Sequence, residues 1–158
     1  MAVHIRLATP HDYATIAEIA QESQNLHERA HPDIYNKDTP GFTEEHIRHL
    51  IEGELTAVYV AEEENTIVGY ELLRVHTPSY FDVFKPQTIA EISDIAVTET
   101  MRGKGVGYLL FEAVKEWAKS REAQRLELTV WEFNRHARAF YERQGMQTLH
   151  RTMTLPIE

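Results

Sequence analysis

The sequence predicts a single α+β domain in which one mixed β-sheet is flanked by helices. Two observations carry this prediction. Strand-like and helix-like periodicities follow the order β-α-α-β-β-β-α-β-α-β, with no internal repeat and no linker between them. The length of 158 residues suits one domain with a sizeable core. We therefore expect residues 1–158 to form one domain.

The first half of the chain indicates three strands and two helices, with one long loop among them. Residues 3–8 alternate as a strand, and Thr9, Pro10 and Asp12 are residue types that begin a helix well. The helical stripe fades at Gln24, so a loop punctuated by Pro and Gly is expected over residues 24–42. The next elements are a short helix over residues 43–51 and strands over residues 56–62 and 67–75.

The second half is organised around residues 89–119. A strand-like segment, IAEISDIAV, leads into the turn Arg102-Gly103-Lys104-Gly105-Val106-Gly107, and a helical stripe comes after it. Glycines let the backbone approach a ligand, and a helix start offers free N–H groups and the positive end of its dipole. The pattern predicts a site for phosphate or pyrophosphate, to which two cations add charge.

The glycine spacing excludes two common phosphate-binding loops. No G-x-x-x-x-G-K-[ST] string occurs, and the third glycine of G-x-G-x-x-G is replaced by Tyr108 or Leu110. R-x-x-G-x-G does fit, from Arg102 to Gly107. It resembles the pyrophosphate loop of the GNAT family of acetyl-CoA-dependent N-acetyltransferases. The alternative is a glycine-rich turn that binds nothing.

A second signature comes later in the chain, in the expected order. Residues 126–131 indicate a strand, and Asn134 to Gly145 indicate a helix with a good N-cap and a good C′ residue. This helix resembles the family signature N-x-x-A-x-x-F-Y-x-x-x-G, although its two aromatic residues would also suit ordinary core packing. A last strand is expected over Gln147–Leu155. The matching positions are Asn134, Ala137, Phe140, Tyr141 and Gly145.

The resemblance implies a GNAT-like fold and transfer of an acetyl group from acetyl-CoA to a primary amine, by direct attack in a ternary complex. It implies Glu91 as the base that deprotonates the amine and Tyr141 as the acid that protonates the CoA thiolate. The alternative is a non-catalytic module of the same fold that binds CoA or acyl-CoA. The implied cofactor-binding residues are Ile95, Ala96, Val97, Arg102, Gly103, Lys104, Gly105, Val106, Gly107, Asn134 and Tyr141.

The identity of the base depends on which face of its strand each residue occupies. Simple alternation puts Glu91, Ser93, Ile95 and Val97 on one face and Asp94 on the other, and a bulge would change that parity. Glu91, Asp94 or a water molecule remain candidates for the base. An ordinary solvent-facing role is the alternative for Glu91, and a structural role for Asp94.

Two segments are expected to line the acceptor site. In family members the segment after the first helix often walls this site, so His27, His31 and Tyr35 are candidates, with an ordered surface loop as the alternative. Tyr80 and Phe81 lie in an aromatic, proline-bounded segment that would cover an acceptor, bury a homodimer contact or tuck under its own loop.

The amino-acid composition limits the classes of ligand and partner that the protein is expected to bind. A formal net charge of −9 argues against nucleic acid and suits a cationic amine, whether small molecule or protein. The absence of cysteine excludes disulfides and thiol nucleophiles, and His46 and His49 lack the further ligand that a metal site needs. No run is apolar enough to span a membrane and no signal peptide is evident, so we expect a cytoplasmic protein without a metal.

Overall fold

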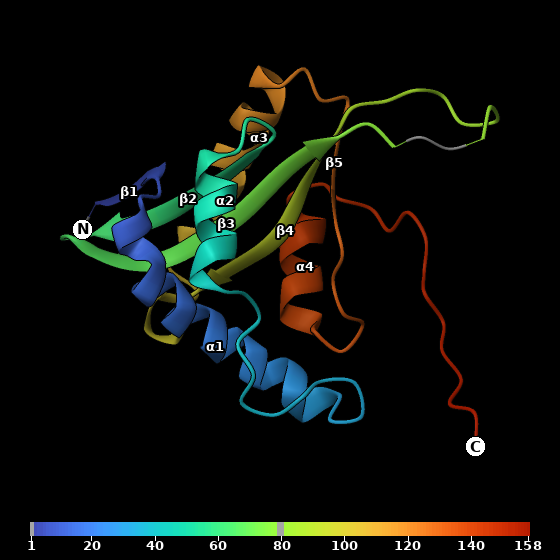
Figure 1. Ribbon diagram of the computed structural model, residues 1–158, viewed down its shortest axis with the longest axis horizontal. Helices are drawn as coiled ribbons and strands as arrows, with labels where there is room; N and C mark the ends of the chain where they lie inside the picture. Colours follow the sequence, from blue (N-terminus) through green and yellow to red (C-terminus); the bar gives the residue numbers. More distant parts are fainter. Residues whose placement is uncertain (1, 79–80) are drawn as a thin grey trace. The chain divides into compact units, whose positions relative to one another are not determined.

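The computed structural model describes residues 2–78 and 81–158, and its elements follow the predicted order over most of the chain (Figure 1). The first elements are β1 (Val3–Leu7), α1 (Tyr13–Ala30), α2 (Glu44–Glu52), β2 (Thr56–Glu63) and β3 (Thr66–His76). The next are β4 (Ile89–Val97), α3 (Val106–Ser120), β5 (Arg125–Leu128) and α4 (Arg135–Arg143). Two 3-10 turns, η1 (Pro10–Asp12) and η2 (Glu99–Met101), precede α1 and α3.

Within the described residues, one five-stranded sheet has the order β1-β2-β3-β4-β5. Neighbouring strands are antiparallel from β1 to β4, whereas β5 joins β4 in parallel. A parallel pair needs a long crossover between its strands, and α3 provides it. The predicted α+β class with a mixed sheet is confirmed.

Different helices cover the two faces of the sheet (Figure 1). On one face, here termed the α1/α2 face, Ile16 and Ile19 of α1 and Ile47 of α2 pack against the strands. On the opposite α3 face, Val106 and Leu110 take that role. The strand residues in the first cluster are Val58, Val60, Tyr70, Leu72 and Ala96, and those in the second are Ala61 and Val68.

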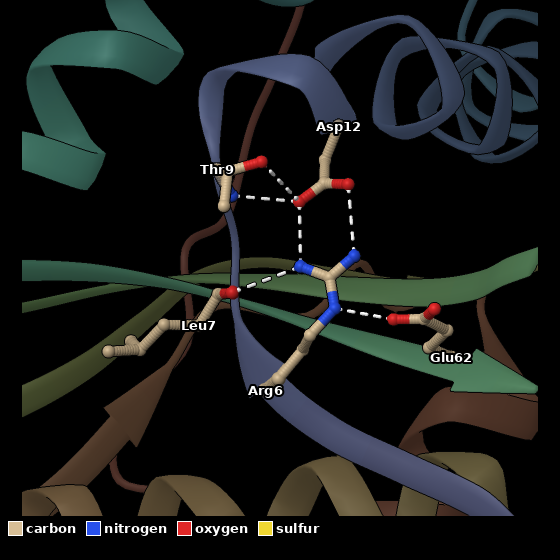
Figure 2. A network of polar contacts seen from close by, with 5 residues as sticks. All are labelled: Arg6, Leu7, Thr9, Asp12 and Glu62. Atoms are coloured by element: carbon tan, nitrogen blue, oxygen red, sulfur yellow. Dashed lines mark hydrogen bonds and ion pairs between the residues drawn. The ribbon is translucent and has the colours of Figure 1, made fainter. Parts of the chain in front are cut away.

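Arg6 of β1 joins the sheet to the start of α1 through a polar network (Figure 2). Its Nη1 and Nη2 donate to the Asp12 carboxylate at 2.9 and 3.1 Å, and Nη1 also donates to the Leu7 carbonyl at 3.1 Å. Nε donates to Glu62 of β2, and Asp12 accepts from the Thr9 N–H at 2.8 Å. Hydrogen bonds from the guanidinium lower the pKa of Asp12. Arg6 therefore ties the helix start, through Asp12, to β1 and β2.

The first helix is longer than predicted. Residues 24–30 are helical, so the loop expected over residues 24–42 begins too early. This segment contains neither Gly nor Pro, and most of its residues are neutral or favourable in a helix. The helix ends where His31 leaves the helical φ/ψ region, directly before Pro32, because a residue preceding proline is disfavoured in the α conformation.

The strand predicted over Gln147–Leu155 is not formed in the described structure, where the residues after α4 carry no helix or strand. Leu149, Met153 and Leu155 are 62%, 92% and 77% exposed. Alternating apolar residues favour a strand, but a strand also needs a hydrogen-bonded neighbour, which the pattern alone does not provide.

The chain divides into two compact units, Met1–Leu128 and Thr129–Glu158. The first contains the sheet with α1, α2 and α3, and the second contains α4. That residues 1–158 act as one acetyltransferase domain stays a prediction.

Candidate active site

Two left-handed glycines shape the turn between β4 and α3. Gly103 has φ +75° and Gly105 has φ +87°, conformations that residues with a side chain rarely adopt. A Cβ built at either position would meet nothing within 4 Å, so the backbone conformation rather than crowding favours glycine. Gly105 is the N-cap of α3, and the first N–H groups of a helix lack intrahelical acceptors. The turn therefore offers N–H groups and the positive helix end to an anion.

A third glycine, Gly69 of β3, lets α3 lie close to the sheet. A Cβ at this position would lie 3.1 Å from the Ala96 carbonyl oxygen. It would also lie 3.3 Å from Leu110 and 3.4 Å from Val106, both in the first turns of α3. Gly69 thus sets how closely the start of α3, and with it the glycine turn, approaches β3.

A bulge in β4 places both acidic residues of the strand on the same face. Consecutive residues of β3 pair with Ile92 and Asp94, so Ser93 is the extra residue. The alternation that separates Glu91 from Asp94 is therefore wrong, because one inserted residue reverses the parity of the strand beyond it. The α1/α2 face of β4 carries Glu91, Asp94 and Ala96, and the α3 face carries Ile92, Ile95 and Val97.

Beyond the bulge, β4 has no ladder partner in β5. The parallel ladder joins Ile89–Ile92 to Arg125–Leu128 and ends there. Residues 93–97 therefore have backbone N–H and C=O groups that β5 does not use. Three of the residues expected to bind the cofactor, Ile95–Val97, lie in this segment and lead directly into the turn.

Asp94 is held on the α1/α2 face by a tyrosine. The hydroxyl of Tyr70, on β3, donates to Asp94 Oδ2 at 2.5 Å. Burial raises the pKa of Asp94, while hydrogen bonds from the Tyr70 hydroxyl and the Ile95 N–H lower it. Burial and the Asp94 charge raise the pKa of Tyr70 well above its usual range. Asp94 is thus a half-buried carboxylate with a fixed orientation.

Glu91 lies on the same face in a different environment. Arg74 of β3 donates through Nε and Nη2 to the two carboxylate oxygens, at 3.0 and 3.1 Å. His76 Nε2 lies 3.6 Å from Glu91 Oε2. The Glu91 side chain is 28% exposed, so it is oriented by a cation and still open to solvent.

The two cations of the glycine turn differ in what they contact. Arg102 Nε donates to the Val97 carbonyl at 3.0 Å, and Nη2 lies 3.8 Å from Glu22 of α1. Lys104 is exposed and forms no ion pair or hydrogen bond with any described residue. Lys104 is therefore the cation available to an anion, whereas Arg102 braces the turn.

The structure brings together only part of the predicted acceptor wall. His27 lies in α1 rather than in a loop, and its ring packs against Tyr35 with centroids 5.6 Å apart. His31 is the C-cap residue of α1. Phe81, between β3 and β4, is 85% exposed, and Tyr80 lies outside the described residues.

In the second unit, the caps of α4 are as predicted. The Asn134 side chain accepts from the Ala137 N–H at 3.1 Å, and Gly145 follows the helix with φ +96°. The rings of Phe140 and Tyr141 contact each other edge to face at 5.4 Å. The helix that carries the predicted acid, Tyr141, is therefore formed and capped at both ends.

Sequence reasoning missed the residues that orient the two carboxylates. Tyr70 and Arg74 follow ordinary strand patterning, and only the register of β3 against β4 shows that they face Asp94 and Glu91. No group of three or more metal-ligating side chains gathers among the residues that the structure describes. No helix in the described part of the chain is long and apolar enough to cross a membrane.

Comparisons with known proteins converge on one family. The model of the acetyltransferase (GNAT) family matches residues 16–146. Bacillus subtilis YhfO, described as an uncharacterized N-acetyltransferase, is 28% identical over 92% of this chain and 90% of its own. The crystal structure of a mutant of the BH1408 protein from Bacillus halodurans is 31% identical, with a TM-score of 0.94 over 98% of this chain and 99% of that one.

A more distant structure has the same fold. It is an aminoglycoside acetyltransferase from an uncultured soil sample, in complex with sisomicin, at 20% identity and a TM-score of 0.70 over 98% of this chain and 97% of that one. The match of the family model over most of the sequence decides the assignment. The chain belongs to the acetyltransferase (GNAT) family.

Proposed function

We propose that this chain transfers the acetyl group of acetyl-CoA to a primary amine by direct attack in a ternary complex. The glycine turn carries the proposal, because Gly103 and Gly105 hold left-handed conformations directly before α3. Such a turn suits the CoA pyrophosphate, with backbone N–H groups as donors and Lys104 as a cation that no described residue pairs. Membership of the GNAT family supports the same cofactor.

The segment of β4 beyond the bulge would hold the pantetheine arm and the thioester. Residues 93–97 have backbone groups outside the β5 ladder, and they lie directly before the turn. N–H groups aimed at the thioester oxygen would stabilise the negative charge that develops on it during attack. Pyrophosphate and acetyl group would thus bind to consecutive stretches of one backbone.

The attacking amine needs a base. An alkyl amine has a pKa of about 10.4 and arrives protonated at neutral pH. We propose Glu91 as the proton acceptor, because its carboxylate is oriented by Arg74 and remains 28% exposed. Asp94 is the alternative, since burial raises its pKa and a base with a raised pKa accepts protons more readily near neutral pH.

The departing thiolate needs a proton, and we propose Tyr141 as its donor. Tyr141 lies in α4, which is capped by Asn134 and followed by left-handed Gly145. A tyrosine hydroxyl has an ordinary pKa of about 10 and can donate to a strongly basic leaving group.

For the acceptor we propose a cationic amine. The net charge of −9 would attract such a substrate, and two carboxylates share the α1/α2 face of β4. The structural relative bound to sisomicin acts on aminoglycosides by its name, which supports the same substrate class here.

The proposal is tested by release of CoA thiol from acetyl-CoA in the presence of a panel of polyamines, amino sugars, aminoglycosides, amino acids and peptides. We expect turnover with at least one cationic amine and none without an acceptor. Binding of acetyl-CoA with no turnover across the panel would favour a CoA-binding module. Preference for an anionic acceptor would contradict the proposed substrate class.

Tyr141→Phe tests the enzyme against the binding module. The change removes one hydroxyl and keeps the ring that packs on Phe140. We expect turnover to fall by about 10²–10⁴-fold while affinity for CoA changes little, provided that the chemical step limits the rate. Near-parental turnover under that condition would mean that the thiolate leaves without Tyr141.

A further inference from the structure

The turn that precedes the glycine loop is held from outside by a side chain of α1. Glu22 Oε1 accepts from the Thr98 hydroxyl at 2.9 Å, and Oε2 accepts from the Glu99 N–H at 2.9 Å. Thr98 and Glu99 lie 76 and 77 positions after Glu22 in the sequence. One carboxylate therefore joins α1 to the first residues after β4.

The same carboxylate also faces the first cation of the loop. Arg102 Nη2 lies 3.8 Å from Glu22 Oε2, while Arg102 Nε donates to the Val97 carbonyl. Backbone bonds within the turn run from the Met101 N–H to the Thr98 carbonyl and from the Arg102 N–H to the Glu99 carbonyl. These bonds shape the turn locally, whereas Glu22 fixes it to a different element.

We propose that Glu22 is a positioning residue for acetyl-CoA. It holds residues 98–102 against α1, so that the glycine turn is formed before the pyrophosphate arrives. The inference rests on the proposed function, since it concerns the same cofactor. The new element is that part of the affinity for CoA depends on α1, a helix that need not contact the cofactor. If the glycine turn is already ordered in the ligand-free protein, binding does not have to offset the entropy cost of ordering it, and the affinity is higher.

Two substitutions separate the hydrogen bonds of Glu22 from its charge. In Glu22→Gln, the amide oxygen can accept from the Glu99 N–H and the amide nitrogen can donate to the Thr98 hydroxyl oxygen. Both contacts are kept, and only the charge facing Arg102 is lost. In Glu22→Ala all three interactions are lost. Glu18→Ala, one turn earlier on the same helix, is the matched control.

Calorimetric titration with CoA gives the first readout. We expect Glu22→Ala to raise the Kd about tenfold, and Glu22→Gln to stay within about threefold of the parent. The Glu18→Ala variant should match the parent. In turnover assays Glu22→Ala should raise the KM for acetyl-CoA by the same factor, with kcat at saturation within about twofold, because a preformed loop changes binding rather than chemistry.

Hydrogen exchange of the ligand-free variants gives a second readout that needs no cofactor. The amides of residues 99–104 should exchange faster in Glu22→Ala and in Thr98→Val than in the parent, and Glu22→Gln should restore protection. A purely structural role would lower the melting temperature of Glu22→Ala without changing the Kd, and that result overturns the inference, as does Glu22→Gln behaving like Glu22→Ala. A parent chain that binds no CoA overturns the proposed function and this inference with it.

Discussion

Each face of the sheet holds a carboxyl group that is at least partly buried, but only one of the two groups has a hydrogen-bond partner among the described residues. On the α1/α2 face, Asp94 accepts a hydrogen bond from Tyr70 at 2.5 Å. On the α3 face, Glu71 is fully buried and no described group hydrogen-bonds to either of its oxygens. Burial raises the pKa of Glu71 to about 9, so this carboxyl group is neutral at physiological pH.

The difference supports the proposal that the proton transfer takes place on the α1/α2 face. Hydrogen-bond donors fix the direction of the two carboxyl groups on the α1/α2 face, Arg74 for Glu91 and Tyr70 for Asp94. Glu71 has lost its charge and lies in the layer that α3 covers. A base that accepts a proton from the amine must be ionised, and a buried neutral acid cannot take that role, so we propose the α1/α2 face for the proton transfer.

Of the variants that compare the two faces, Glu91→Gln should give the largest change, a loss of turnover. With the proposed base removed, turnover should fall by about 10²–10⁴-fold, and higher pH should partly restore it because the amine then deprotonates itself. Measurement of kcat against pH for the parent and the variant tests this.

Two variants serve as controls for that experiment. Glu71→Gln, on the other face, should keep kcat within about twofold of the parent, as expected for a change that touches no catalytic group. If Asp94→Asn collapses turnover while Glu91→Gln does not, the base is Asp94. Parental turnover in both variants would remove the α1/α2 face of β4 from proton transfer.

Tyr70→Phe should have the next largest effect, on stability. It removes the hydroxyl that donates to Asp94 and leaves a half-buried carboxylate short of one partner, which costs about 1–3 kcal/mol of unfolding free energy. Denaturant titration measures this cost. Tyr59→Phe, on the strand next to Glu71, is the matched control and should change stability by less than about 0.5 kcal/mol. Equal losses of unfolding free energy in both variants would mean that the hydrogen bond from Tyr70 to Asp94 adds no stability of its own.

Glu71 itself should give an effect on stability that depends on pH. Its pKa is 4.5 in the unfolded reference and about 9 in the folded chain, so the folded state holds the proton longer. The stability that Glu71 contributes is therefore fully present below about pH 4.5 and is lost progressively as the pH rises toward 9. Glu71→Gln removes this dependence. Unfolding free energies of the two proteins at several pH values between these limits should diverge, and a constant difference would contradict the assignment.

Local patterns in the sequence predict most of the fold and part of the site. The element order over most of the chain, the glycine turn before α3 and the caps of α4 depend on neighbouring residues, and the structure agrees with these predictions. The bulge at Ser93 depends instead on how β3 pairs with β4, so periodicity within one strand could not predict it.

The same distinction explains the other differences. The contacts of Glu22 with Thr98 and of Arg6 with Glu62 join residues far apart in the sequence, and no local motif marks them. The strand expected at the C-terminus had a suitable pattern but is not paired in the described structure. Residues whose role depends on a distant partner are thus the ones that sequence reasoning missed.

The central claim, that the glycine turn binds the pyrophosphate of acetyl-CoA, is tested most directly by calorimetric titration of CoA into the parent and Gly107→Glu. Gly107 lies in the first turn of α3, where a glutamate would add bulk and negative charge beside the expected phosphates. Gly41→Glu, which meets only Gln24 at 3.9 Å, adds the same side chain elsewhere and is the matched control. We predict that Gly107→Glu weakens CoA binding at least about tenfold, or 1.4 kcal/mol, whereas Gly41→Glu binds like the parent. Equal affinity in all three proteins would contradict the assignment of the turn.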